Sequence, residues 1–566
     1  MTPKSQHSFR FKDRIMPRIL LLTAGLAAGI LLNSGCGDRT KTPETRTPET
    51  RSTDPRASGP KRVVSSSDKT SSDKTSSDKT SSDKTREEIP PTSKAAQLRE
   101  TWEAVYMANT KVGSIHTVFE TVQRNGDTMI KASSVQKLKI KRADQSVAME
   151  TRIESMETEE GALRSFTLES SLGGMPRTVT GTYRNGALHL VTTGRGNAER
   201  TTLPWSDDHG GFFALEQSFD QQPMKPGEER ELTMLMPGVV GVQPVTTRLR
   251  AQSPERVDLL DGSSRRLLKI AMNSQMGNQE LESFCWTSPD GTVLKTTIPA
   301  LQQTIYRTTQ DTAEAAGSQE YDLFWDSIVR VTPPLPHPHE LAHAKYEISL
   351  TEKDPANLFA SGGSQRVRSI APRKAEITVR AVRPDSEPPE AQAEAPAPET
   401  LAPNSLIQAD DPQVVKMAQD LVDPKSERWA KCVALEKGVH EAIQDKNFGQ
   451  GFATAADVAR SLEGDCTEHA VLLAALCRAE SIPARIALGL VYSPSDQGFA
   501  FHMWTEAWVN ERWTPLDATL GRGGIGAAHL KLRHSTLASE DAESAILSVV
   551  QVIHQLEIKV LDFQPR

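Results

Sequence analysis

Alternation of apolar and polar positions dominates the chain from residue 102 to about residue 307. The clearest alternating segments are 112–122, 135–140, 177–183 and 187–192. Asn-Gly and Asp-Gly pairs punctuate this region, and such pairs are the strongest short-range signals of a β-hairpin. The pairs are Asn125-Gly126, Asn185-Gly186, Asp261-Gly262 and Asp290-Gly291. The pattern predicts a mainly antiparallel β domain over 96–312, without a cluster of residues typical of a catalytic site.

Residues 470–477 follow a different pattern, because they are apolar on every side of a helix. A helix of that kind is buried. Asp465 is suited to cap its N-terminus, and Glu468, three residues later, completes a capping-box pattern. These signals place Cys466 at the first position of the helix, where the charge of Glu468 would work weakly against a thiolate. The next segment, 484–492, is predicted to be a buried strand.

Two strand-like runs, 500–509 and 512–519, are separated by two residues and predict a β-hairpin. With that loop, His502 becomes a diagonal neighbour of Asp517 on one face of the hairpin. Diagonal neighbours lie about 7–8 Å apart between Cα atoms, so their side chains can meet. Glu506 is four strand residues from His502, at about 3.3 Å each, which is too far to orient the imidazole.

Cys466, His502 and Asp517 therefore form a candidate catalytic set, in which a thiol nucleophile has a base and an orienting carboxylate. The positive end of the helix dipole favours the thiolate, and a nearby imidazolium would lower the thiol pKa further. Each residue alone would be interpreted as structural, but the capped helix and the aligned hairpin together favour catalysis. His469 and His529 are rival bases, and we expect helix packing for the first and a structural role for the second.

These segments resemble the core motifs of the transglutaminase-like superfamily. The matching residues are Gly464-Asp465-Cys466, Ser481-Ile482-Pro483-Ala484-Arg485, His502 with Trp504, and Trp513-Thr514-Pro515-Leu516-Asp517. Only Ser481 departs from the family pattern, which has glycine there. The resemblance covers about 409–526 and is to the bacterial secreted branch rather than the animal cross-linking enzymes. It implies an α+β, papain-like domain over 409–566, with Cys466 as nucleophile, His502 as base and Asp517 as orienting residue.

The implied chemistry is attack of the Cys466 thiolate on a carboxamide or peptide carbonyl to form a thioester. A lysine amine would then give transglutamination, whereas water would give deamidation or proteolysis. A cysteine peptidase or amidase acting on cell-envelope peptides is thus an equal alternative, and a non-catalytic peptide-binding module is a second one. The backbone N–H of Cys466 is a candidate oxyanion donor. Trp504 and Trp513 are candidate walls of the site, although ordinary core packing explains them equally well.

No cofactor and no metal site are predicted. Cys466 and Cys477 lie eleven residues apart on one helix, or about 16 Å at a rise of 1.5 Å per residue, so they cannot share an ion. The glycine-rich segment 521–526 follows a strand without opening a clear helix, which argues against a phosphate-binding loop. We expect it to be a flexible loop beside the active site.

The start of the chain predicts export. Basic residues precede the apolar run 19–32, and Asn33-Ser34-Gly35-Cys36 follows, which is typical of a signal peptide over 1–35. The apolar run is short for a membrane span, and small residues before a cysteine resemble a bacterial lipobox. Cys36 is therefore predicted to be lipidated and to anchor the protein in the cell envelope, on the periplasmic or outer-membrane side. Ordinary signal-peptidase cleavage and an uncleaved anchor are the alternatives.

The segment 36–95 is predicted to be a disordered tether, because it has almost no apolar residues and repeats Ser-Ser-Asp-Lys-Thr four times over 66–85. Linkers are predicted at 313–345 and at 383–408, the second rich in Pro, Ala and Glu. Between them lies a short β module, 346–382. In the last domain, helices are expected from near residue 411, over 426–444 and 455–462, and again in a tail, 541–563, that ends in a strand.

Composition narrows the functional classes further. The 566 residues allow about three cores, and a net charge of -7 argues against a nucleic-acid binder. Five cysteines, two of them with predicted roles at Cys36 and Cys466, are too few for a disulfide framework. The expected partners are a protein or peptide substrate and, through the N-terminal lipid, a membrane. The sequence does not predict the oligomeric state.

Overall fold

The structure is a computed structural model that describes residues 96–565 except 125, 143–144, 173–174, 195–197, 239–240, 318, 385–393 and 445–452. The predicted signal peptide 1–35, the lipidation site Cys36 and the tether 36–95 lie outside the described residues, as do residues 385–393 of the predicted linker 383–408. Within the described part of the chain, no helix has the length and apolar character needed to cross a membrane.

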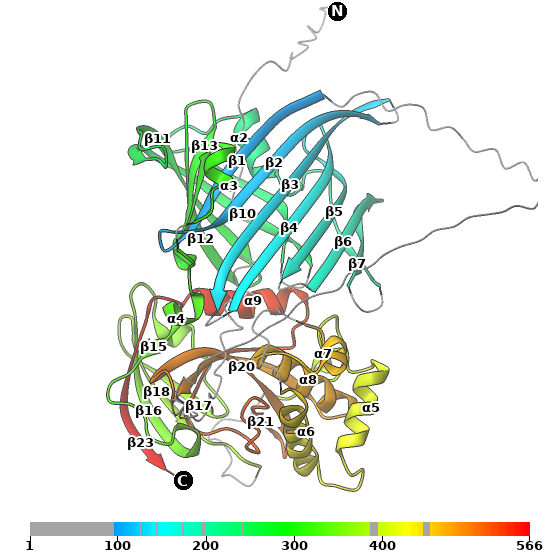
Figure 1. Ribbon diagram of the computed structural model, residues 1–566, viewed down its shortest axis with the longest axis vertical. Coiled ribbons are helices and arrows are strands. Elements are labelled where there is room, and N and C mark those ends of the chain that lie inside the picture. The colour runs from blue at the N-terminus through cyan, green and yellow to red at the C-terminus, as the bar shows by residue number, and fades with distance from the viewer. Residues whose placement is uncertain are drawn as a thin grey trace, which may run out of the picture. The chain divides into compact units, whose positions relative to one another are not determined.

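The predicted β domain is one fourteen-stranded sheet, which Figure 1 shows to be strongly curved. Its order is β8 to β1 followed by β14 to β9, so every strand pairs with a neighbour in sequence, β1 also pairs with β14, and β8 and β9 are the two end strands. The strands are β1 (Ala96–Met107), β2 (Thr110–Arg124), β3 (Asp127–Arg142), β4 (Gln145–Thr158), β5 (Leu163–Leu172), β6 (Met175–Arg184), β7 (Ala187–Thr193), β8 (Glu199–Pro204), β9 (Glu229–Pro237), β10 (Val242–Asp258), β11 (Ser264–Met276), β12 (Gln279–Thr287), β13 (Val293–Ile298) and β14 (Gln303–Thr308).

Sequence alternation and turn chemistry explain this sheet. Buried and more exposed residues alternate along β4, as expected when one face of a strand packs on a core. Asn185 and Gly186 have φ values of 52° and 78° between β6 and β7, and a two-residue hairpin loop with positive φ at both positions matches the twist of its strands. The Asp-Gly pairs lie between β10 and β11 and between β12 and β13. The prediction of an antiparallel β domain is confirmed.

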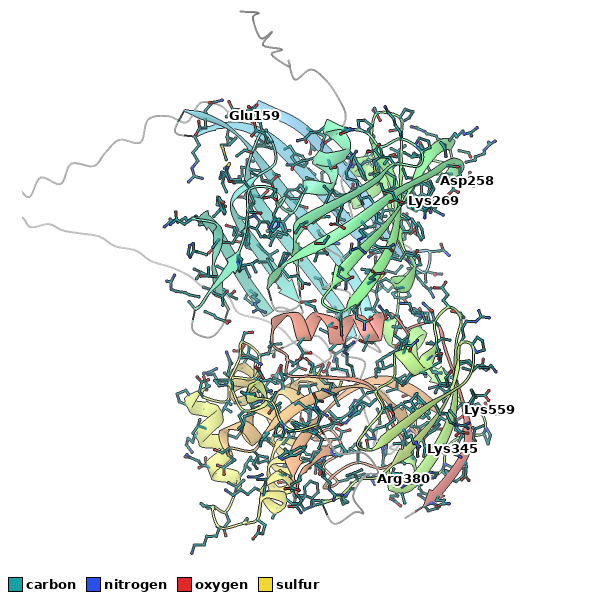
Figure 2. The ribbon with its side chains drawn as sticks, turned by 180° about the vertical axis from the view of Figure 1, so that it is seen from behind. Glu159, Asp258, Lys269, Lys345, Arg380 and Lys559 are labelled. Carbon is teal, nitrogen blue, oxygen red and sulfur yellow. The ribbon has the colours of Figure 1, made fainter. Side chains whose placement is uncertain are left out.

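A four-stranded sheet of order β17-β18-β16-β23 joins the predicted β module to the end of the chain. Its strands are β16 (Leu341–Leu350), β17 (Gln365–Ala371), β18 (Lys374–Arg380) and β23 (Leu556–Pro565). Figure 2 labels one basic residue on each of the three adjacent strands: Arg380 on β18, Lys345 on β16 and Lys559 on β23. The last strand therefore closes a sheet that begins about two hundred residues earlier.

A five-stranded sheet carries the residues of the predicted active site. It has the order β15-β20-β19-β22, and β21 pairs with β20. The strands are β15 (Val329–Arg330), β19 (Ala484–Ser493), β20 (Gly498–Val509), β21 (Arg512–Leu516) and β22 (His529–Ser535). Every residue of β19 is buried, because both faces of the strand are covered.

Two helices, α2 (Ala214–Gln221) and α3 (Gln310–Glu314), pack on the fourteen-stranded sheet. The five-stranded sheet is contacted by α4 (Leu323–Ser327), α8 (Cys466–Ala479) and α9 (Ser539–Val550), and the buried helix α8 is surrounded by α5 (Pro412–Leu421), α6 (Arg428–Ala442) and α7 (Ala455–Ser461). Helices α5, α6 and α7 pack on α8, which itself packs on β20 (Figure 1). The hydroxyl of Thr505 on β20 donates to the carbonyl of Ala470 on α8 at 3.0 Å. The helices and strands predicted after residue 409 are confirmed, and the class of this domain is α+β.

Candidate active site

The first turn of α8 positions Cys466. The Asp465 side chain accepts a hydrogen bond from the Thr467 backbone N–H at 2.9 Å, and the Glu468 side chain accepts one from the Asp465 backbone N–H at 3.0 Å. This is the predicted capping box. Gly464 makes the tight approach possible, because a Cβ there would lie 2.3 Å from the Glu468 side chain at a φ of 150°. Cys466 is thus fixed as the first residue of the helix, with 2% of its surface exposed.

Glu468 affects the thiol less than its formal charge suggests. Burial, and after it the neighbouring Asp465, raises the pKa of Glu468 well above its usual value. The neutral form of Glu468 is therefore favoured more than in an exposed glutamate, which reduces its charge repulsion of a thiolate. Glu468 therefore opposes a thiolate at Cys466 less than the sequence predicted.

The hairpin of β20 and β21 brings His502 and Asp517 together. Val509 pairs with Arg512, and the two loop residues between them both have positive φ, which is the predicted two-residue turn. The Nε2 atom of His502 lies 2.8 Å from Oδ2 of Asp517. Each residue is 1% exposed. The predicted contact between the imidazole and the carboxylate across the hairpin is confirmed.

Asp517 accepts more hydrogen bonds than the sequence indicated. Its Oδ1 accepts from the backbone N–H of Thr519 at 2.9 Å and from the Thr519 hydroxyl at 2.5 Å. Its Oδ2 also lies 3.1 Å from Nε2 of His529 on β22. Burial alone would raise the pKa of Asp517, but His502 and His529 outweigh it and hold the pKa well below its usual value. Asp517 is an anion that accepts hydrogen bonds on both oxygens.

The two ring nitrogens of His502 lie in different surroundings. The Nδ1 atom of His502 is buried and has no hydrogen-bond partner, while its Nε2 is engaged by Asp517. In the described part of the chain, therefore, the structure joins His502 to Asp517 and positions Cys466 separately through the first turn of α8. Catalytic hydrogen bonds are often long in the absence of substrate, so Nδ1 remains the atom of His502 that can exchange a proton.

Glu436 on α6 also belongs to the site, although the sequence did not indicate it. Its side chain is fully buried. Oε1 accepts from the backbone N–H of Asp517 at 2.9 Å, and Oε2 accepts from that of Gly523 at 2.6 Å. Oε1 also accepts from Gly524 N–H at 3.2 Å. Glu436 thereby ties the orienting aspartate to the segment 521–526, which we call the glycine loop.

Stability should depend on pH through Glu436. Burial raises its pKa from 4.5 to about 7, against the opposing effect of the backbone N–H groups. A carboxyl whose pKa is higher in the folded state contributes stability that is complete below about pH 4.5 and is lost as pH rises to about 7. Glu436→Gln removes this titration, so the free energy of unfolding of wild type relative to the variant should fall over this range, by on the order of 3 kcal/mol.

Urea unfolding of the two proteins at a series of pH values measures this difference, in which groups common to both cancel. Glu441→Gln is the matched control, since Glu441 lies on the same helix with a side chain that is 63% exposed. A constant difference between wild type and Glu436→Gln from pH 4.5 to pH 8 would contradict the prediction.

The two tryptophans proposed as walls lie in different surroundings. The Trp504 ring is stacked beside His502, with centroids 6.3 Å apart, and packs with Ala487 and Ile525 of the glycine loop. Its buried indole N–H has no hydrogen-bond partner. The Trp513 indole instead donates to the Glu394 carbonyl at 2.9 Å. Trp504 therefore borders the histidine directly, whereas Trp513 contacts the segment 383–408 that was predicted to be the second linker.

His502, Asp517 and His529 are also the one group among the described residues whose spacing would suit a metal ion, with ligand atoms within 4.8 Å of one another. Each histidine Nε2 already lies at hydrogen-bond distance from Oδ2 of Asp517. A proton on Nε2 of each histidine, donated to Oδ2 of Asp517, explains why the three ligand atoms lie so close together. The sequence predicted no metal site, and we interpret the group as a hydrogen-bonded cluster.

The remaining cysteines of the described chain are structural in their surroundings. Cys285, Cys432 and Cys477 are buried, and they form no disulfide with one another or with Cys466. Burial raises the pKa of Cys285, which favours its inert thiol form. A hydrogen bond with Cys432, followed by burial, raises the pKa of Cys477 well above its usual value.

Residues 415–518 match the family model of the transglutaminase-like superfamily. This segment begins in α5 and ends just after Asp517, so it includes all three predicted catalytic residues. The resemblance inferred from the motifs is confirmed for this segment, whose class is that of the transglutaminase-like superfamily. No curated protein sequence matches the chain.

Several solved structures are distantly similar. A candidate cysteine protease from Cytophaga hutchinsonii is 17% identical, with 40% of this chain and 86% of that chain covered and a TM-score of 0.24. The periplasmic domain of TgpA from Pseudomonas aeruginosa is 15% identical, with 32% and 70% covered and a TM-score of 0.22. A β-barrel-like protein of the family DUF1849 from Brucella abortus is 7% identical, with 37% and 94% covered and a TM-score of 0.25. At these scores, no property of those proteins is transferred to this chain.

Proposed function

We propose that the C-terminal domain is a thiol acyl-transfer enzyme with a papain-like triad of Cys466, His502 and Asp517. The observation that carries the proposal is the buried hydrogen bond between His502 Nε2 and Asp517 Oδ2, at 2.8 Å. It lies within a segment that matches the transglutaminase-like family, and the same segment holds a cysteine at a capped helix N-terminus. The intact set of three argues against a module that only binds peptides.

Each residue has a role that follows from its surroundings. Asp517 accepts the Nε2–H of His502, which leaves the lone pair on Nδ1 available as a base. The Cys466 thiol gives its proton to Nδ1, and the thiolate sulfur attacks the carbonyl carbon of a carboxamide or peptide. The resulting oxyanion accepts from the Cys466 backbone N–H at the start of α8. The proton on Nδ1 then passes to the leaving nitrogen, and a thioester with Cys466 remains.

The second substrate decides the product. A primary amine that attacks the thioester gives a new amide, and water gives the free acid and restores the thiol. The sequence predicts export and a lipid anchor at Cys36, so we propose that the first substrate is a protein or peptide of the cell envelope. The fourteen-stranded domain would lie on the same side of the membrane as this substrate.

Mass spectrometry of the products tests the proposal. The full chain is incubated with a glutamine-containing peptide, with and without a primary amine. A peptide joined to the amine identifies transfer, a glutamate in place of the glutamine identifies deamidation, and peptide fragments identify proteolysis. Protein treated beforehand with iodoacetamide is the control and should give none of these products. If the peptide is unchanged under all conditions and no acyl adduct forms on Cys466, the enzyme assignment is contradicted and the binding module is favoured.

A further inference from the structure

One oxygen of Asp517 is shared by two histidines from different strands. Oδ2 lies 2.8 Å from Nε2 of His502 on β20 and 3.1 Å from Nε2 of His529 on β22. The backbone N–H and the hydroxyl of Thr519 occupy Oδ1. An ionised carboxylate accepts hydrogen bonds and donates none, so both histidines must carry a proton on Nε2. The tautomer of each histidine is thereby fixed by the same atom.

His529 acts as a neutral donor in this arrangement. Burial lowers its pKa, and the attraction of Asp517 does not fully offset that effect. The titratable groups of the described chain that face it are Asp517, His502 and His339, the last from η2 (Pro338–Glu340) with ring centroids 6.1 Å apart. A neutral imidazole that donates to Oδ2 partly compensates the negative charge of that oxygen, and it adds no positive charge beside His502.

We propose that His529 is a positioning residue for the triad, which holds Oδ2 of Asp517 in line with His502 and limits how strongly Asp517 stabilises the imidazolium form of His502. The inference rests on the proposed function, because it matters only where His502 exchanges a proton with Cys466. The imidazolium must release its proton to the leaving nitrogen. An Oδ2 bonded to His502 alone would stabilise the imidazolium more and make Nδ1 a weaker proton donor, whereas an Oδ2 shared with His529 stabilises it less and favours release of the Nδ1 proton.

The test is the pH dependence of Cys466 alkylation by iodoacetamide in the full-length protein, followed by mass spectrometry of the modified peptide. The upper transition of this profile reports loss of the imidazolium proton. His529→Leu should move it to higher pH by about half to one unit, since one hydrogen bond to the carboxylate is lost. His529→Gln should leave it near the wild-type position, because the glutamine side-chain amide can donate to Oδ2. His339→Leu is the matched control, and we expect no shift.

Four outcomes would overturn the inference. A His529→Leu profile that coincides with wild type makes His529 merely structural, and so does an equal shift in His529→Leu and His529→Gln. An equal shift in His339→Leu would assign the effect to packing. If the wild-type protein binds zinc in stoichiometric amount and His529→Gln does not, His529 is a metal ligand instead. If His502→Ala leaves the wild-type profile unchanged, the proposed function itself fails, which is a distinct result.

A second measurement covers the case in which His529→Leu does not fold. In the low-field proton spectrum of the wild-type protein, the imidazole N–H resonances of His502 and His529 should both be protected from exchange, beside that of buried His469, whose Nδ1 lies 2.6 Å from the Asp465 carbonyl oxygen. His529→Gln should remove one protected resonance and shift that of His502 only slightly. A wild-type spectrum that loses no protected resonance in His529→Gln would show that His529 does not donate to the carboxylate.

Discussion

Replacement of Cys466 by alanine should abolish acyl transfer, with a loss of at least about 10⁴-fold in the rate of peptide modification. The proposed reaction forms a covalent bond to this sulfur, and no other described cysteine lies in comparable surroundings. Cys285, Cys432 and Cys477 are fully buried, and burial or hydrogen bonding favours the thiol form of Cys285 and Cys477. The measurement is the initial rate of product formation from a glutamine peptide, with iodoacetamide labelling of the same preparations.

Cys285→Ala provides the matched control, because it removes a buried thiol from β12 and leaves the helix α8 intact. This variant should retain the wild-type rate and the wild-type labelling of Cys466. Thermal unfolding of both variants separates loss of chemistry from loss of fold. A Cys466→Ala protein that still forms product at more than a hundredth of the wild-type rate would mean that Cys466 is not the nucleophile.

Local signals determined the parts of the fold that the sequence predicted well. The capping box of α8 depends on residues at most three positions apart, and the turn after Val509 depends on two residues. Hairpin signals likewise identified the antiparallel β domain, because almost all its strands pair with their neighbours in sequence. By contrast, the pairing of β16 with β23 joins segments far apart in the chain, and no local pattern specifies such a partner.

The same distinction explains which contacts of the site were not predicted. His502 and Asp517 meet across one short hairpin, so strand register alone predicts their contact. His529 reaches Asp517 only because β22 adds to the far side of β19, where Val491 pairs with His529. Glu436 approaches from α6, and in the sequence it is one acidic residue on a helix. The only signal in the sequence was the position of this acidic residue between the apolar residues Leu435 and Val439, which are buried. The burial of Glu436 itself follows from tertiary packing.

Asp517→Asn should lower kcat by about 10³–10⁴-fold with little effect on the fold. The carboxylate accepts from His502, and an asparagine that turns its amide NH₂ toward Nε2 would force that nitrogen to accept instead. The imidazole proton would then lie on Nδ1, which could no longer take the proton of the Cys466 thiol. A serine-protease triad loses about 10⁴-fold in kcat through this change of tautomer. The thiolate fraction of Cys466 at neutral pH should fall as well, because a neutral amide stabilises the imidazolium less than a carboxylate does.

Thr519→Val separates the tautomer effect from general loosening of the carboxylate. It removes the hydroxyl that donates to Oδ1 but keeps the backbone N–H that donates to the same oxygen. We expect a loss of less than about tenfold, in keeping with one hydrogen bond among several. The two variants are compared in kcat and in the rate of Cys466 alkylation at neutral pH. Equal losses in both would indicate that rigidity of residue 517, and not the position of the imidazole proton, limits the reaction.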